Sequence, residues 1–216
     1  MKSLVLFSAT LAVALFANAT AQAAHLDNPN QLIDPSFEGT ITTDGAPFIG
    51  TWEGFSAGLS STSDFTTTSP RTGAQSLEMN IGPDTNLFAG AFQDVYFGPA
   101  LAGADAWFSG WHQSVGTTGG SEYRIEWRDS VGNVEVSRTQ LTASPAGSGY
   151  EEFIIADTIP AGADTARLVY AIQSFGGALN QTVYVDDVNF NYVRIPEPTT
   201  ALLALVGLAP LARRRR

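Results

Sequence analysis

The chain has 216 residues, 44% of them hydrophobic, with 11 Lys and Arg residues against 21 Asp and Glu residues and a net charge of -10. An acidic surface of this kind repels nucleic acid and anionic lipid head groups, so we expect neither as a partner. The sequence has no cysteine and two histidines, which excludes disulfide bonds, cysteine nucleophiles, cysteine-ligated zinc and a metal site built from several histidines.

The N-terminal residues 1–23 have the three parts of a secretory signal peptide. Lys2 provides a positive charge, residues 4–16 are almost wholly apolar, and residues 19–23 offer small side chains at a cleavage site. We therefore predict that the protein is exported and that this segment is removed. The mature domain is expected to span residues 24–194, about the length of one domain.

Short runs rich in β-branched and aromatic residues recur through the mature domain, separated by Gly, Asn, Pro and Ser. The Ser/Thr-rich residues 60–69 are interpreted as a surface loop, and residues 129–133 as a hairpin connection. Strands are expected at residues 31–37, 52–54, 75–79, 88–96, 106–113, 123–128, 135–140, 150–156, 165–173 and 182–192. Many short strands at fairly regular spacing, with no sustained helical period, predict an all-β fold, a two-sheet β-sandwich.

Four segments follow one another across the mature domain. They are Leu-Ile-Asp-Pro-Ser-Phe-Glu-Gly at 32–39, Arg-Thr-Gly-Ala-Gln-Ser-Leu at 71–77, a proline followed by an apolar strand at 159–170, and Val-Tyr-Val-Asp-Asp-Val at 183–188. Together they resemble, in the same order, segments of jelly-roll carbohydrate-binding modules of the galactose-binding-like superfamily. The resemblance implies that the β-sandwich is a jelly roll and that the domain binds a glycan.

A structural calcium ion is common in that superfamily, held by an early Glu, a late Asp and backbone carbonyl groups. The resemblance implies Glu38 and Asp186 as calcium ligands here, with Asp187 as a neighbour that can substitute. Calcium takes roughly six to eight oxygen ligands, which the first and last strands would supply if they lie side by side. The alternative is that Glu38 caps a turn and that Asp186 and Asp187 are solvated residues at a strand end.

Sugar-binding proteins stack aromatic side chains on sugar rings and hydrogen-bond the hydroxyl groups with amides, carboxylates and arginines. The candidate aromatic residues are Trp52, Trp107, Trp111, Tyr123, Trp127 and Tyr170. Strand alternation places Trp107 with Trp111 on one face and Tyr123 with Trp127 on another, which favours core packing for most of them. Trp52 lies in a Gly-rich segment and is expected to be more exposed.

The predicted ligand-binding residues are therefore Trp52, His112 and Arg124. His112 and Arg124, together with Glu126, lie on the strand faces opposite the tryptophans and would line a shallow binding surface. The alternative is that these three polar residues are ordinary surface.

One five-residue pattern, Gly-Phe-Ser-Ala-Gly at 54–58, matches the nucleophile elbow of serine hydrolases. That chemistry needs Ser56 on a sharp turn from a strand into a helix, beside an oxyanion hole. No helical pattern follows Ser56, and so short a pattern arises by chance in a chain rich in Gly and Ser. Paired carboxylates of the glycosidase kind are common in an acidic chain but have no further support. We therefore predict that the protein is not an enzyme.

The C-terminal residues 195–216 contain Ile-Pro-Glu-Pro, an apolar run at 199–212 and four arginines. The apolar run is shorter than the ~20 residues that cross a hydrocarbon core comfortably, and the arginines favour the cytoplasmic side. The tail resembles the PEP-CTERM sorting signal of Gram-negative bacteria that secrete exopolysaccharide. The sorting residues are Pro196, Glu197, Pro198, Arg213, Arg214, Arg215 and Arg216.

This resemblance implies an exosortase-type transpeptidase as a partner. The tail, as a short hydrophobic helix, would hold the protein transiently in the inner membrane until cleavage near Pro-Glu-Pro. We therefore predict an exported, non-catalytic protein of the cell envelope or the extracellular polysaccharide, with polysaccharide as its ligand. The alternative is a structural or adhesive biofilm-matrix protein with no defined small ligand.

Overall fold

The computed structural model describes residues 29–39, 51–57, 60–116, 120–140, 142–143, 148–174 and 180–193. The expected signal peptide (1–23) and sorting tail (195–216) lie outside these ranges, so both stay predictions. No helix in the described part of the chain is long and apolar enough to cross a membrane.

The described residues form two antiparallel sheets, whose hydrogen-bonded strands follow one another in the order given below. Sheet A contains β1 (Glu53–Ser56), β4 (Phe88–Tyr96), β10 (Thr165–Gln173), β6 (Gly120–Asp129) and β7 (Val134–Arg138), with β8 (Thr142–Ala143) paired to β6. Sheet B contains β2 (Ser61–Thr66), β3 (Ser76–Ile81), β11 (Gln181–Tyr192), β5 (Asp105–Gly116) and β9 (Glu151–Thr158). A short 3-10 helix, η1 (Pro99–Leu101), precedes β5.

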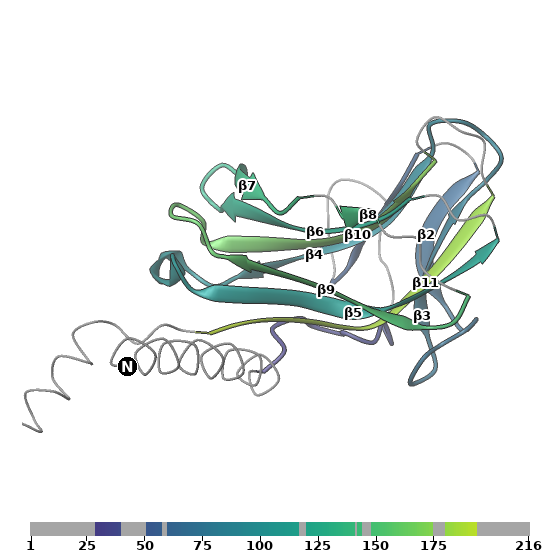
Figure 1. Cartoon of the computed structure of the whole chain (residues 1–216), viewed down its shortest axis with the longest axis horizontal. Helices are drawn as coiled ribbons and strands as arrows, with labels where there is room; N and C mark the ends of the chain where they lie inside the picture. The colour runs from purple at the N-terminus through teal and green to yellow at the C-terminus, as the bar shows by residue number, and fades with distance from the viewer. Residues whose placement is uncertain are drawn as a thin grey trace, which may run out of the picture.

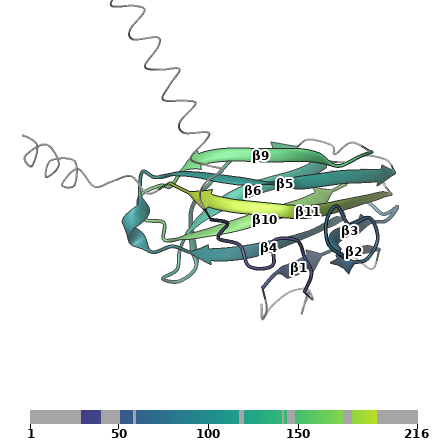
Figure 2. The same cartoon turned by 90° about the horizontal axis from the view of Figure 1, so that it is seen from below.

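The predicted all-β, two-sheet β-sandwich is confirmed. Figure 1 shows the sheets as two layers, and Figure 2, seen from below, shows β9, β5 and β11 of sheet B side by side. The chain alternates between the sheets from β3 to β6 and again from β8 to β11. The predicted hairpin at 129–133 is confirmed, since it joins β6 to β7 with Gly132 and Asn133 at φ angles of 80° and 54°.

Two of the expected elements are wrong. Residues 31–37 form a turn, because the carboxylate of Asp34 accepts the N–H groups of Glu38 and Gly39, each at 2.8 Å. The turn places Phe37, with a φ angle of 55°, fully inside the core. Residues 60–69 contain strand β2, which pairs with β3 along its whole length. Long-range pairing thus overrides the loop-like composition of this segment.

The core lies between the two sheets. On β6, Tyr123, Ile125 and Trp127 point inwards and are at most 6% exposed. The largest fully buried side chains include Trp127, Phe37, Phe108, Phe153 and Phe190. Each such side chain contributes roughly 1.5–3 kcal/mol relative to an exposed one. A continuous aromatic core therefore stabilises a domain that has no disulfide bonds.

Candidate functional site

The side chains of sheet A that point away from the core form one continuous surface, called here the outer face of sheet A. Because paired residues of antiparallel strands share a face, the register aligns Glu53, Phe92, Val169 and Arg124 in one row across β1, β4, β10 and β6. The face has a charged half over β6 and β7 and an aromatic half over β1, β4 and β10.

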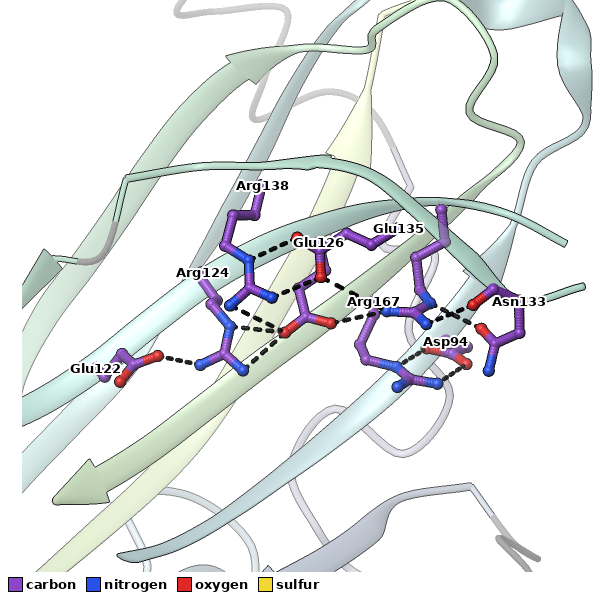
Figure 3. Close-up of polar contacts among 9 residues, drawn as sticks. Asp94, Glu122, Arg124, Glu126, Asn133, Glu135, Arg138 and Arg167 are labelled. Atoms are coloured by element: carbon purple, nitrogen blue, oxygen red, sulfur yellow. Dashed lines mark hydrogen bonds and ion pairs between the residues drawn. The ribbon is translucent and has the colours of Figure 1, made fainter.

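The charged half is a network of arginines and glutamates, drawn in Figure 3. Glu126, only 5% exposed, accepts hydrogen bonds from Arg124 Nε at 2.8 Å and from Arg128 Nη1 at 3.1 Å. Arg138 Nη1 lies 3.9 Å from the same carboxylate. Arg138 also binds Glu135, through Nε at 2.6 Å and Nη2 at 2.5 Å. The hydrogen bond from Arg138 lowers the pKa of Glu135. Each carboxylate here therefore has a guanidinium partner.

Arg124 also pairs with Glu122, which is 3% exposed, so this arginine bridges two buried carboxylates. Outside the two terminal segments the chain has six arginines, which are Arg71, Arg124, Arg128, Arg138, Arg167 and Arg194. Four of the six lie on the outer face of sheet A. An otherwise acidic domain thus concentrates its cationic hydrogen-bond donors on one surface.

The aromatic half is a small apolar cluster in which Phe92, Val169 and Ala171 are at most 6% exposed and Phe55 packs against them. The ring of Phe55 lies 6.2 Å from that of Phe92 and 6.1 Å from that of Phe88, measured between centroids. Gly90 makes this packing possible, because a Cβ there would lie 2.4 Å from the Phe55 ring. Phe88 is 40% exposed and extends the cluster to the surface.

Arg167 joins the two halves. Its guanidinium carbon lies 4.1 Å from the centroid of the Phe92 ring, and it binds Asp94 through Nε at 2.7 Å and Nη2 at 2.8 Å. A bidentate pair of this kind fixes the orientation of the arginine. Aromatic rings beside oriented arginines and carboxylates are the groups that recognise the apolar faces and the hydroxyl groups of sugars.

The three predicted ligand-binding residues do not come together. Arg124 lies in the charged half, as described above. Trp52 is 2% exposed, packs at 4.9 Å against Phe37 and donates from Nε1 to the carbonyl oxygen of Asp34 at 2.9 Å. The expectation that Trp52 is exposed is therefore wrong, because the turn at 34–39 covers a residue whose local sequence looks loop-like.

His112 lies in the core rather than on a surface, at 2% exposure. Its Nδ1 is 2.6 Å from the hydroxyl of Tyr170, and its ring packs against those of Tyr123 and Phe153. Burial lowers the pKa of His112, although Glu151 at 3.7 Å opposes the shift. A buried, largely neutral histidine of this kind specifies packing and does not line the outer face of sheet A.

The alternation of β5 explains why His112 is buried in the core whereas Trp107 and Trp111 are not. Ala106, Phe108 and His112 point inwards, so Trp107 and Trp111 share the outer face of sheet B and are half-buried. The prediction that these two tryptophans share a face is confirmed, but their assignment to the core is wrong. The core assignment is right for Tyr123, Trp127 and Tyr170.

The three expected calcium ligands all hold the segment 71–75, and together they are called here the carboxylate clamp. Glu38 Oε1 accepts the N–H groups of Ala74 at 2.8 Å and Gln75 at 3.2 Å. The residue before Ala74 must be glycine, because the φ angle of Gly73 is 63° and a Cβ there would lie 2.0 Å from Glu38 Oε1. The clamp thereby ties the first described segment to the turn that precedes β3.

The last strand holds the other side of the same segment. Asp186, fully buried, accepts the N–H groups of Arg71 at 2.7 Å and Thr72 at 3.0 Å through Oδ2, and that of Asp187 at 2.7 Å through Oδ1. Asp187 pairs with the Arg71 guanidinium and accepts from the hydroxyls of Ser36 at 2.8 Å and Thr72 at 2.6 Å. Burial raises the pKa of Asp186.

This arrangement does not fit a calcium ion. Calcium needs converging oxygen lone pairs, but five of the six clamp oxygens already accept N–H or O–H donors, and Arg71 supplies a positive charge to Asp187. Among the described residues, no group of three or more acidic or histidine side chains is arranged to hold a metal ion. Glu38 therefore behaves as the turn-capping residue of the alternative interpretation, whereas Asp186 and Asp187 are bonded rather than solvated.

Ser56 ends the edge strand β1, and the next described element is strand β2, so the surroundings of a nucleophile elbow are not found there. A pocket of about 390 Å³ lies at the ends of β3, β5 and β11, lined by uncharged residues that include Asn80, Val115 and Thr182. The pocket shares no residue with the outer face of sheet A.

No family model and no curated protein matches the chain. Its structure is similar to the enzymatically active domain of bacteriophage CBA120 tailspike protein 4, with a TM-score of 0.58 and 17% identity over 76% of this chain and 21% of that one. It is similar to the CBM22-1 xylan-binding domain of Paenibacillus barcinonensis Xyn10C, with a TM-score of 0.52 and 15% identity over 78% and 97%. It is also similar to a family 16 carbohydrate-binding module, with a TM-score of 0.51 and 14% identity over 75% of this chain and 99% of that one.

The chain thus spans about a fifth of the tailspike domain but nearly the whole length of the two carbohydrate-binding modules. At these identities the likeness shows the fold, and the neighbours among the binding modules are of the jelly-roll type. The resemblance read from the sequence is confirmed at that level.

The sequence missed the aromatic half and Arg167. Only Trp and Tyr were considered as stacking residues, so Phe55, Phe88 and Phe92 were passed over. The signal was present, because Phe88 and Phe92 share one phase of β4 with Asp94.

Proposed function

We propose that this protein is an exported, non-catalytic glycan-binding protein that binds polysaccharide on the outer face of sheet A. The observation that carries the proposal is the juxtaposition of Phe88 and Phe55 with Arg167 and Arg124 on one surface of a jelly-roll sandwich. The jelly-roll carbohydrate-binding neighbours, one of them a xylan-binding domain, support it.

The two terminal segments of the sequence support export and sorting to the cell envelope. The signal peptide directs export, and the PEP-CTERM-like tail would be recognised by an exosortase-type enzyme after transient insertion into the inner membrane. The mature domain would then reside in the cell envelope or extracellular matrix of a Gram-negative bacterium. Fractionation of cells that express the chain with Glu197→Ala tests this route, and we expect the variant to accumulate unprocessed in the membrane fraction.

Affinity electrophoresis of the full-length chain in gels that contain soluble polysaccharides tests the binding. We expect Phe88→Ala to weaken retardation, because it removes the exposed ring of the aromatic half. Ile154→Ala is the matched control, since Ile154 is an equally accessible apolar residue, 50% exposed, on β9 of the other sheet. Equal retardation of the two variants would contradict the assignment of the site.

The alternative is a structural or adhesive matrix protein without a defined ligand. The charged half favours it to a degree, because its arginines are already paired within the protein. A chain that self-associates or joins a biofilm but is retarded by no polysaccharide would establish this alternative. Turnover of a glycan or an ester by the wild-type chain would instead contradict the non-catalytic assignment.

A further inference from the structure

Glu53 is the first residue of β1, the edge strand in the aromatic half of the outer face of sheet A. Its Cα pairs with that of Phe92, and Phe55 follows two residues later on the same side of the strand. The side chain is nearly buried, with 5% of the residue exposed. Its neighbours are therefore the aromatic cluster on one side and the pair of Asp94 and Arg167 on the other.

The oxygen Oε2 of Glu53 is buried and accepts no hydrogen bond. Within the described ranges, Glu53 is the only carboxylate with such an oxygen. Arg167 does not donate to this oxygen, and its Nε and Nη2 groups both bind Asp94. Arg124, in the same cross-strand row, donates to Glu122 and Glu126 instead.

A buried polar atom without a partner opposes folding, so native proteins contain few of them and each needs an explanation. Burial raises the pKa of Glu53, the charge of Asp94 raises it further, and the charge of Arg167 opposes both. The carboxyl group thus stays protonated to higher pH than usual. In that form it can both donate and accept a hydrogen bond, as a sugar hydroxyl does.

We propose that Glu53 hydrogen-bonds a hydroxyl group of a neutral sugar unit that packs against the phenylalanines of β1 and β4. This assignment rests on the glycan-binding function proposed above. A neutral sugar is favoured over a uronic acid, because a ligand carboxylate at this position would face Glu53 and Asp94, and the Nε and Nη2 groups of Arg167 already donate to Asp94. Phe55 and Phe88 offer ring surface for the apolar face of the sugar.

Calorimetric titration of the full-length chain tests the proposal. The probes are three neutral oligosaccharides, namely xylotetraose, cellotetraose and β-1,4-galactotriose, and one acidic oligosaccharide, an oligogalacturonate. We expect Glu53→Ala to weaken binding of the best neutral probe about tenfold, the effect of one hydrogen bond to a ligand hydroxyl. We expect Glu53→Gln to retain affinity within about threefold, because the amide also donates and accepts.

Thermal unfolding of the same variants separates binding from structure. Glu53→Ala removes no internal hydrogen bond of Oε2, so we expect a midpoint that is unchanged or higher. Glu78→Gln is the matched control, because Glu78 is a half-buried glutamate on β3 of the other sheet that accepts from Asn80 at 2.6 Å. This control should bind as the wild type does.

Each outcome decides a different point. Wild-type binding that Glu53→Ala leaves unchanged would overturn the assignment of Glu53 while the proposed function stands. Tighter binding of the oligogalacturonate than of any neutral probe would overturn the neutral class. A wild-type chain that binds none of the probes and is retarded by no polysaccharide would remove the proposed function, and the role of Glu53 with it.

Discussion

The carboxylate clamp and the outer face of sheet A are both rich in acidic side chains, but they satisfy them differently. In the clamp, Asp186 and Glu38 accept five hydrogen bonds from backbone N–H groups, which cannot turn away. On the outer face of sheet A the donors are arginine side chains, and Glu53 Oε2 has none. Backbone donors fix a loop, whereas side-chain donors and an unused acceptor leave room for a ligand.

The largest effect is expected in the clamp, from Asp186→Ala. Asp186 is fully buried, and the substitution leaves three backbone N–H groups without their acceptor. We expect the free energy of unfolding, measured with denaturant, to fall by about 3 kcal/mol. Asp84→Ala is the control, since Asp84 lies in an exposed contact with Ser60, and its effect should stay below about 0.5 kcal/mol. A loss below about 1 kcal/mol for Asp186→Ala would contradict the rigid role of the clamp.

A smaller effect is expected on the outer face of sheet A, from Glu126→Ala. Three arginines lose a shared carboxylate, but their long side chains can turn towards water. We therefore expect a loss of about 2 kcal/mol in the same denaturant measurement. If Glu126→Ala costs more than Asp186→Ala, the charged half is the more rigid region and the comparison is reversed.

Arg71→Ala tests whether a side chain replaces a metal ion in the clamp. Arg71 pairs with Asp187 and its guanidinium carbon lies 3.9 Å from the centroid of the Trp111 ring, so we expect a loss of about 1 kcal/mol. Arg138→Ala, at 44% side-chain exposure, is the matched control and should cost about 0.5 kcal/mol.

Thermal unfolding of the wild-type chain, measured once with EDTA and once with calcium, tests the calcium prediction. We expect equal midpoints in both conditions, because five of the six clamp oxygens already have donors. A calcium-dependent rise in the midpoint that Glu38→Ala and Asp186→Ala abolish would show that calcium displaces those donors. It would also establish the ion that the sequence resemblance implies.

The smallest effect concerns the acid stability of the clamp. Burial raises the pKa of Asp187, but hydrogen bonds from Thr72, Ser36 and Arg71 outweigh it, so the pKa is lowered in the folded protein. An unfolded Asp titrates at about pH 3.9, so the stabilisation is present above that pH and is lost as the pH falls through the folded-state pKa. We expect Asp187→Asn to cost about 0.5 kcal/mol at pH 6 and almost nothing at pH 3.

Denaturant unfolding of Asp187→Asn at those two pH values checks this. Equal losses at pH 6 and pH 3 would mean that Asp187 stabilises the fold by packing rather than by charge.

The strands were readable from the sequence because β-branched and aromatic residues alternate with polar ones over enough residues to define a period. β4 and β10 have the predicted bounds for this reason. The turn at 31–37 was not readable, since it depends on hydrogen bonds that the Asp34 carboxylate forms after the chain has bent. Strand β2 was also missed, because its polar residues are ordered by pairing with β3.

The candidate site was predictable only in part. Arg124 was identified from the alternation of β6, but Phe92 and Arg167, which contact each other on the same face, come from strands far away in the sequence. Their contact depends on the strand order of sheet A, which no local pattern encodes. The orphan oxygen of Glu53 is likewise a property of which arginines reach it, and only the folded arrangement decides that.

The sequence by itself determined the all-β class and the absence of disulfide and thiol chemistry, and it predicts the two terminal sorting segments. These follow from composition and from short-range order along the chain. The tertiary structure alone decided which face of β5 carries Trp107 and Trp111, which carboxylates clamp the segment 71–75, and where the arginines gather. The reason is that alternation fixes which residues share a face, whereas only packing against the second sheet decides which face is buried.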